Sequence, residues 1–210
     1  MNCDAIARWY RLLEYLVFGK ALEGRRCRFL DRVCTAKRVL ILGDGDGRFT
    51  AAFLRRNAIA RVESIDLSAG MLRLAQRRLP DKELTRRVEF REEDARTAEL
   101  TGAYDLIVSH FFLDCFRSDE VNRLIARLAQ KTAPGSLWLI SEFGVPMAEP
   151  FRTAGRLLIR VMYFFFGLAT DLTANELPDY AGALRHHGFT KVEESVAARG
   201  LLVSEVWQRI

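Results

Sequence analysis

Apolar residues along this chain follow two periods, one typical of buried strands and one typical of amphipathic helices. The run Val39–Leu42 is continuously apolar, as expected of a parallel strand that is buried on both faces. Residues 48–56 follow, with Phe49, Ala52 and Phe53 on one face of a predicted helix. Similar patterns predict helices over residues 69–79, 118–131 and 176–187, a strand over residues 136–142, and a hairpin of residues 190–196 and 201–208. These elements fit one α/β domain, because no linker or repeat divides the 210 residues.

Turn and cap residues support several of these boundaries. Ser68 is placed to cap the second predicted helix, which Pro80 ends. Gly188 follows the last predicted helix at the position of a C-terminal cap. Arg199-Gly200 is the predicted turn of the closing hairpin.

Two further helices are predicted before the first strand. They cover residues 4–18 and 22–33 and are separated near Gly19. We expect them to form an N-terminal helical cap, residues 1–35, outside the sheet.

The most informative segment is the turn between the strand Val39–Leu42 and the next helix. Gly43, Gly45 and Gly47 stand at alternate positions there, as in a nucleotide-binding strand–turn–helix unit. Glycine suits such a turn because the turn is tight and a ligand must approach bare backbone. The dinucleotide fingerprint Gly-x-Gly-x-x-Gly would place Gly or Ala at position 48, where this chain has Arg48.

Four segments in order resemble the motifs of class I S-adenosylmethionine (SAM) dependent methyltransferases of the small-molecule type. They are the glycine turn, residues 61–72 with Asp66, residues 88–95 with Asp94, and residues 104–114. The resemblance implies a Rossmann-like three-layer α/β fold. It implies a seven-stranded, mostly parallel sheet of order 3-2-1-4-5-7-6 whose last strand is antiparallel. The implied cofactor is SAM, with S-adenosylhomocysteine as product.

The resemblance also implies roles for individual residues. Asp66 would accept the two ribose hydroxyls, and Asp94 would accept a hydrogen bond from the adenine amino group. The full set of implied cofactor-binding residues is Gly43, Asp44, Gly45, Asp46, Gly47, Asp66, Leu67, Met71, Asp94, Ala95 and His110.

One position departs from the family's pattern. The family usually has an acidic residue two positions before the first glycine of the turn, and Ile41 occupies that place. Asp44 and Asp46 lie within the turn instead. Either would be able to serve the methionine end of the cofactor, and the sequence does not choose between them.

Composition places the chain among globular proteins of a reducing compartment. Half of its residues are hydrophobic and 28% are charged. The four cysteines, Cys3, Cys27, Cys34 and Cys115, show neither metal-ligand spacing nor a disulfide framework, so no metal site is expected. The N-terminal residues do not resemble a signal peptide, which favours the cytoplasm.

The net charge of +5 allows two interpretations. It indicates either an anionic partner, such as a nucleic acid or a lipid surface, or arginines on solvated helix faces. We favour the second interpretation. The sequence lacks the Asn-Pro-Pro-Tyr type of motif that base-amino DNA methyltransferases carry after their fourth strand, so no nucleic-acid partner is expected.

Residues 145–175 form a predicted lid-like insertion between the fifth strand and the last helix. Arg152, Arg156 and Arg160 recur every four residues and would form one cationic stripe on a helix. Most other positions there are apolar, and the run is too short to span a bilayer. Candidate acceptor-binding residues are Tyr10 from the N-terminal cap and Met162, Tyr163 and Phe165 from the insertion.

This insertion has three alternative roles. It packs on the core as a plain lid helix, it lines an apolar acceptor pocket, or it lies in a membrane interface with its arginines at headgroup level. The motif pattern also resembles ubiquinone and menaquinone C-methyltransferases, which act on prenylated acceptors. That resemblance keeps a lipid or quinone among the candidate acceptors, and peripheral membrane contact among the candidate interactions.

His110 is the candidate general base, because it ends the fourth strand at the edge where such sheets bind ligands. Its alternative role is contact with the cofactor or plain packing. Asp114 is the second candidate catalytic residue, either orienting His110 or binding a polar group of the acceptor.

The leading functional hypothesis is SAM-dependent methyl transfer to a small, apolar acceptor. An NAD(P)-dependent oxidoreductase is the second hypothesis, and Arg48 argues against it. The third is a catalytically degenerate SAM-binding protein that associates with a membrane or a partner, which Ile41 favours.

Overall fold

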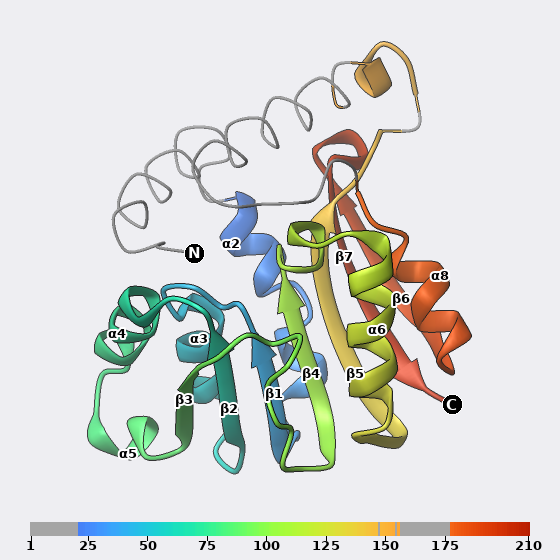
Figure 1. Ribbon diagram of the computed structural model, residues 1–210. Coiled ribbons are helices and arrows are strands. Elements are labelled where there is room, and N and C mark those ends of the chain that lie inside the picture. The colour runs from blue at the N-terminus through green and yellow to red at the C-terminus, as the bar shows by residue number, and fades with distance from the viewer. Residues whose placement is uncertain (1–20, 147, 154, 156–176) are drawn as a thin grey trace.

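One seven-stranded sheet organises the chain, in the order β3-β2-β1-β4-β5-β7-β6 (Figure 1). The computed structural model describes residues 21–146, 148–153, 155 and 177–210. The strands are β1 Arg38–Leu42, β2 Arg61–Asp66, β3 Val88–Glu92, β4 Tyr104–His110, β5 Thr132–Phe143, β6 Phe189–Ala197 and β7 Leu202–Arg209. Only β7 runs antiparallel to its neighbours β5 and β6. The predicted fold, strand order and antiparallel last strand are therefore confirmed.

Helices cover both faces of the sheet. The α-helices are α2 Ala21–Arg26, α3 Arg48–Arg56, α4 Ala69–Arg78, α5 Lys82–Thr85, α6 Ser118–Ala129 and α8 Tyr180–His186. Three short 3-10 turns are η1 Leu30–Val33, η2 Leu113–Cys115 and η3 Ala198–Gly200. Helices α6 and α8 lie on one face, and α2, α3 and α4 lie on the other (Figure 1). This arrangement gives the three layers that the resemblance implies.

Two hydrophobic cores follow from the alternation of side chains along each strand. In β1, Leu40 and Leu42 pack in the core beneath α6, whereas Val39 and Ile41 pack in the core beneath α3. All four are almost fully buried. Burying one such side chain contributes about 1.5–3 kcal/mol, so a central strand with apolar residues on both faces holds the two layers together.

The helix predicted over residues 22–33 is divided in the structure. Helix α2 ends at Arg26, and the chain turns through Cys27 to Phe29 before η1 begins at Leu30. Phe29, Leu30 and Val33 pack in the core beneath α3. The prediction of one helix was wrong because the apolar spacing alone did not show this turn.

The last helix and the hairpin turn also differ from their predicted bounds. Helix α8 begins at Tyr180, because the Asp179 carboxylate accepts a hydrogen bond from Gly182 N at 2.8 Å and so caps the helix there. The hairpin tip is longer than the two residues predicted. Ala198 and Arg199 both have positive φ, and the tip forms η3 instead of a two-residue turn.

Several predicted features lie outside the described residues. They include the first predicted helix, Tyr10, Met162, Tyr163, Phe165 and most of the predicted insertion over residues 145–175. Within the described segments, Cys27, Cys34 and Cys115 are free thiols, and no group of three His, Cys, Asp or Glu side chains is placed to hold a metal ion. None of the described helices combines the length and apolar character needed to cross a membrane.

Candidate active site

The glycine turn between β1 and α3 has a backbone that favours glycine at three positions. Gly43, Gly45 and Gly47 have φ values of 63°, 60° and 77°. A Cβ on Gly43 would clash with the Phe112 ring, and a Cβ on Gly47 would lie 2.6 Å from the Cα of Ala75. Two of the three glycines are thus required by packing as well as by backbone conformation.

Gly45 differs from its two neighbours because its Cα faces open space. A Cβ built there would find only the sulfur of Met71 within reach, at 4.0 Å. A side chain at position 45 would occupy this open space. This is the kind of cradle into which a nucleoside-bearing ligand fits, and the sulfur of Met71 lies beside it.

Asp66 ends β2 beside this cradle. One of its carboxylate oxygens accepts a hydrogen bond from Gly45 N at 3.2 Å, and the other accepts one from Ser68 N at 2.9 Å. Burial raises the pKa of Asp66, although both hydrogen bonds oppose that shift. The next side chain, Leu67, is 39% exposed, which is unusual for a large apolar residue beside a sheet edge. An ionisable carboxylate and an exposed apolar side chain therefore stand together at the cradle.

The two aspartates of the turn have partners within the protein. The Asp44 carboxylate is buried and accepts hydrogen bonds from Phe49 N, from Thr50 N at 2.9 Å and from Thr50 Oγ1 at 2.6 Å, which caps the first turn of α3. Asp46 forms ion pairs with Arg48 at 3.2 Å and with Arg78 at 2.6 Å. Both carboxylates thus bind groups of the protein itself and stabilise this turn.

Ile41 occupies the place of the acidic residue that the family usually has. Its side chain is 1% exposed and packs in the core beneath α3. A carboxylate at this position would be buried among apolar side chains, which is costly without a partner. The isoleucine that replaces the family's acidic residue is therefore part of the hydrophobic core.

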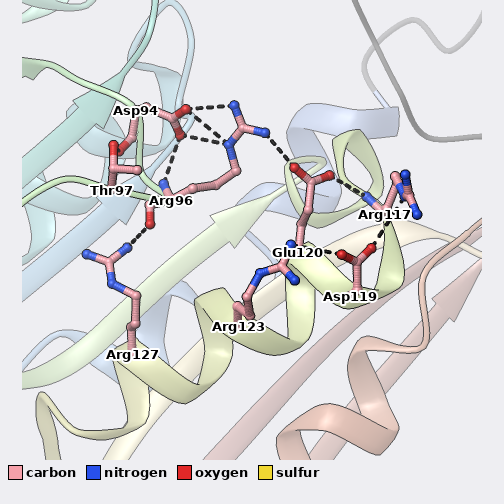
Figure 2. Close-up of polar contacts among 8 residues, drawn as sticks. All are labelled: Asp94, Arg96, Thr97, Arg117, Asp119, Glu120, Arg123 and Arg127. Atoms are coloured by element: carbon pink, nitrogen blue, oxygen red, sulfur yellow. Dashed lines mark hydrogen bonds and ion pairs between the residues drawn. The ribbon is translucent and has the colours of Figure 1, made fainter.

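Asp94 lies in the loop after β3 and is held by an arginine (Figure 2). Arg96 binds both carboxylate oxygens of Asp94 at 2.7–3.0 Å, and its other end binds Glu120 of α6 at 2.6 Å. Arg127 of α6 donates to Ala98 O in the same loop at 2.6 Å. The Arg96 hydrogen bonds lower the pKa of Asp94 and keep it ionised. The loop that the resemblance assigns to adenine is thus fastened to α6.

His110 ends β4 and is buried. Its ring contacts the ring of Phe49 edge to face, with centroids 4.9 Å apart, and neither ring nitrogen has a hydrogen-bond partner. Burial, with a smaller contribution from the nearby Arg26 charge, lowers the pKa of His110 to about 3. The ring is therefore neutral at physiological pH and a weak proton acceptor. The hydrogen bond by which Asp114 would orient His110 is not formed.

Glu142, which the sequence analysis did not single out, ends β5 next to this region. It is 1% exposed, and one carboxylate oxygen accepts hydrogen bonds from Phe112 N at 3.1 Å and Leu113 N at 2.9 Å. Its neighbour is Asp114 of η2, and burial raises the pKa of both carboxyl groups. A sequence signal for Glu142 was available. It is an acidic residue near the end of a buried strand, at the same edge of the sheet as Asp66 and His110.

The structure thus brings most of the predicted cofactor residues to one edge of the sheet. Gly45 N donates a hydrogen bond to Asp66, and the Met71 sulfur lies beside the open space at Gly45. Gly43 lies against Phe112 of the loop after β4. Ala95 follows Asp94 in the loop after β3. This edge contains the carboxyl ends of β1 and β4, where open α/β sheets bind ligands.

Comparison with known sequences gives the same assignment over slightly less than half of the chain. Residues 39–135 match a family described as a methyltransferase domain. A malonyl-[acyl-carrier protein] O-methyltransferase of Acetivibrio thermocellus is 30% identical over 106 residues, which cover 50% of this chain and 35% of that protein. A demethylmenaquinone methyltransferase of Renibacterium salmoninarum is 29% identical over 118 residues, 56% of this chain and 46% of that protein.

A third relative carries out a different transfer. A polyamine aminopropyltransferase of Clostridium acetobutylicum is 38% identical over 80 residues, 34% of this chain and 28% of that protein. The chain therefore matches less than half the length of each of these relatives.

Solved structures share the fold. The mitomycin 7-O-methyltransferase MmcR has a TM-score of 0.69 at 18% identity, covering 91% of this chain and 55% of that one. Human N-acetylserotonin methyltransferase in complex with SAM has a TM-score of 0.68 at 15% identity, covering 97% of this chain and 55% of that one.

Proposed function

We propose that this chain is a class I SAM-dependent methyltransferase and that it transfers the methyl group of SAM to a small molecule. One observation carries the proposal. The Asp66 carboxylate accepts a hydrogen bond from Gly45 N, and the space beside the Gly45 Cα is open, so that a carboxylate and a bare cradle lie together at the carboxyl edge of the sheet. That arrangement suits a ligand with a ribose, and the matched methyltransferase domain includes both residues.

SAM, when bound, supplies a methyl group on a positively charged sulfur, which is already activated for transfer. The protein's residues would bind and orient it. Asp66 would accept the ribose hydroxyls, Asp94 the adenine amino group, and Leu67 and Met71 would contact the apolar faces. Proximity and alignment of the two reactants contribute on the order of 7–11 kcal/mol in well-aligned cases, so positioning accounts for much of the expected rate.

We further propose that the acceptor is small and apolar, with a lipid-like or quinone-like molecule among the candidates. Support comes from the apolar composition of residues 156–167 and from the likeness to a demethylmenaquinone methyltransferase. In this proposal, one domain carries an N-terminal cap over residues 1–35 and a lid over residues 145–175. Phe165→Ser should then raise the KM for the acceptor and leave SAM affinity unchanged.

Peripheral membrane contact is tested separately. Replacement of Arg152, Arg156 and Arg160 by Gln should release the protein from anionic vesicles, because each cation near such a surface contributes about 1 kcal/mol. If vesicles never retain the wild-type protein, the membrane part of the proposal is wrong and the acceptor part is unaffected.

The proposed activity is tested by incubating the protein with methyl-labelled SAM and fractionated cell extracts. Formation of S-adenosylhomocysteine together with a labelled product supports the enzyme. Binding of SAM with no turnover in any fraction would favour the degenerate binding protein instead.

A further inference from the structure

Two carboxyl groups meet beside the proposed cofactor site. Glu142 near the end of β5 is buried, and its hydrogen-bonding neighbour Asp114 of η2 is partly buried. One oxygen of Glu142 holds the backbone of the loop after β4, through Phe112 N and Leu113 N. The other oxygen, Oε2, is buried and has no hydrogen-bond partner. An unpartnered buried carboxylate oxygen is costly, so this atom is available to a ligand or a proton.

The surroundings of the pair contain further acidic groups. Cys115 of the same turn lies within electrostatic range of Asp114, Glu142 and Asp66. Tyr180 of α8 lies within electrostatic range of Glu142, and its hydroxyl is hydrogen-bonded to Glu205. The Arg26 charge acts on His110. Glu142 forms no ion pair with any described residue.

Two carboxyl groups placed in this way favour a state in which they share one proton. Two carboxylates in contact repel one another, and burial disfavours the charged form of both. Burial and mutual repulsion therefore raise the pKa of the pair, and Glu142 is shifted well upward. A positive charge placed nearby would reverse the balance and favour the form with one proton fewer.

Building on the proposed function, we infer that Asp114 and Glu142 form the proton-accepting site for the methyl acceptor. The pair holds one proton in the empty protein and releases it when the positively charged cofactor binds. The carboxylate left behind then accepts the proton that the acceptor loses.

The chemistry balances without a further reactant. A new bond forms between the acceptor's oxygen or nitrogen and the methyl carbon, while the carbon–sulfur bond breaks and leaves its electron pair on sulfur. The acceptor's O–H or N–H proton passes to the carboxylate pair. The acceptor class is therefore a molecule with a hydroxyl or amine at the methylated position. A carboxylate acceptor, which has no proton to lose at neutral pH, would not need the pair.

The inference is tested by counting protons released on ligand binding. Calorimetric titrations in buffers of different ionisation enthalpy give the number of protons released by SAM and by S-adenosylhomocysteine. Both ligands carry the same ribose, adenine and amino group, so the difference between them reports the charged methylsulfonium group. We expect SAM to release more protons than S-adenosylhomocysteine at pH 7, up to about one more per site.

Matched variants assign that difference to the pair. Glu142→Gln retains an oxygen for Phe112 N and Leu113 N, and Asp114→Asn is the second variant should the first fail to fold. Either one should abolish the difference in proton release. Glu205→Gln is the control, because Glu205 is a buried carboxylate that Lys191 neutralises at 3.0 Å on a neighbouring strand. The control should retain the difference.

Failure of this inference is distinguishable from failure of the proposed function. If wild-type protein and Glu142→Gln bind SAM with equal proton release, the inference is wrong and the proposed function stands. If neither SAM nor S-adenosylhomocysteine binds, the proposed function itself is wrong. With an acceptor in hand, Glu142→Gln should lower kcat at least tenfold at neutral pH and leave the Kd for SAM within threefold.

Discussion

Gly47 lies directly against Ala75 of α4, so closely that a Cβ on the glycine would lie 2.6 Å from both the Cα and the Cβ of Ala75. This contact joins the glycine turn after β1 to the helix after β2. The two segments follow neighbouring strands of the sheet, β1 and β2, and carry the first two motifs of the sequence. Their spacing, and hence the width of the proposed cradle at Gly45, is set by the absence of a side chain at position 47.

Substitutions in the turn should separate stability from binding. Gly47→Ala should destabilise the fold by about 1–3 kcal/mol, because the added methyl group overlaps Ala75 and the backbone has positive φ. Gly45→Ala meets only open space, so it should cost less stability and instead weaken SAM binding. Urea unfolding and calorimetric titration of both variants measure the two effects. Equal loss of stability in both would contradict the assignment of Gly45 to the cradle.

Asp44 should act on stability and not on cofactor affinity. Asp44→Ala removes the acceptor of three hydrogen bonds at the start of α3 and should cost about 1–3 kcal/mol in urea unfolding. Thr50→Val is the matched control that removes only the hydroxyl bond, and it should cost less. SAM affinity should stay within threefold in both variants. A loss of SAM affinity that exceeds the loss of stability would assign Asp44 to the methionine end of the cofactor.

His110 should contribute to the dependence of stability on pH. Its folded pKa of about 3 lies below the unfolded value of about 6.5, so its contribution is full above pH 6.5 and is lost as the pH falls toward 3. At pH 5 the loss should be about 2 kcal/mol. His110→Phe, which can still pack against Phe49, should remove that part of the acid-side decline. An unchanged difference in unfolding free energy between pH 8 and pH 5 would show that the ring is accessible to protons.

The affinity for SAM should fall on the acid side because of Asp66. Burial raises the pKa of Asp66, and a protonated carboxyl loses part of its capacity to accept ribose hydroxyls. The decline should therefore begin at a higher pH than an ordinary aspartate would give. Asp66→Asn, which cannot titrate, should bind more weakly and lack this acid-side decline. Parallel pH profiles for wild-type protein and Asp66→Asn would assign the titration to another group.

Local patterns predicted the elements on which the proposed site is built. The bounds of α3 agree with the predicted residues 48–56, and the predicted Ser68 cap is present, since its hydroxyl accepts from Met71 N at 3.2 Å. These features depend on neighbours within one turn of helix, which the sequence displays directly. The strand order came from the resemblance, because periodicity does not state which strands pair.

What the sequence did not predict depends on contacts between distant residues. Arg96 reaches Glu120 across 24 positions, and Glu142 reaches the loop at residues 112–114 across about 30. The prediction that Asp114 would orient His110 was made from their closeness in sequence. In the structure the two side chains have different surroundings, and Asp114 neighbours Glu142 instead.

The central claim is that SAM binds at Gly45 and Asp66, and calorimetric titration of wild-type protein and Asp66→Ala with SAM and with NAD tests it most directly. Wild-type protein should bind SAM and not NAD. Asp66→Ala should weaken SAM binding tenfold or more with the fold intact, because each hydrogen bond to a charged group contributes about 1.5–3 kcal/mol. Near wild-type affinity in a folded Asp66→Ala variant, or preferential binding of NAD, would contradict the account.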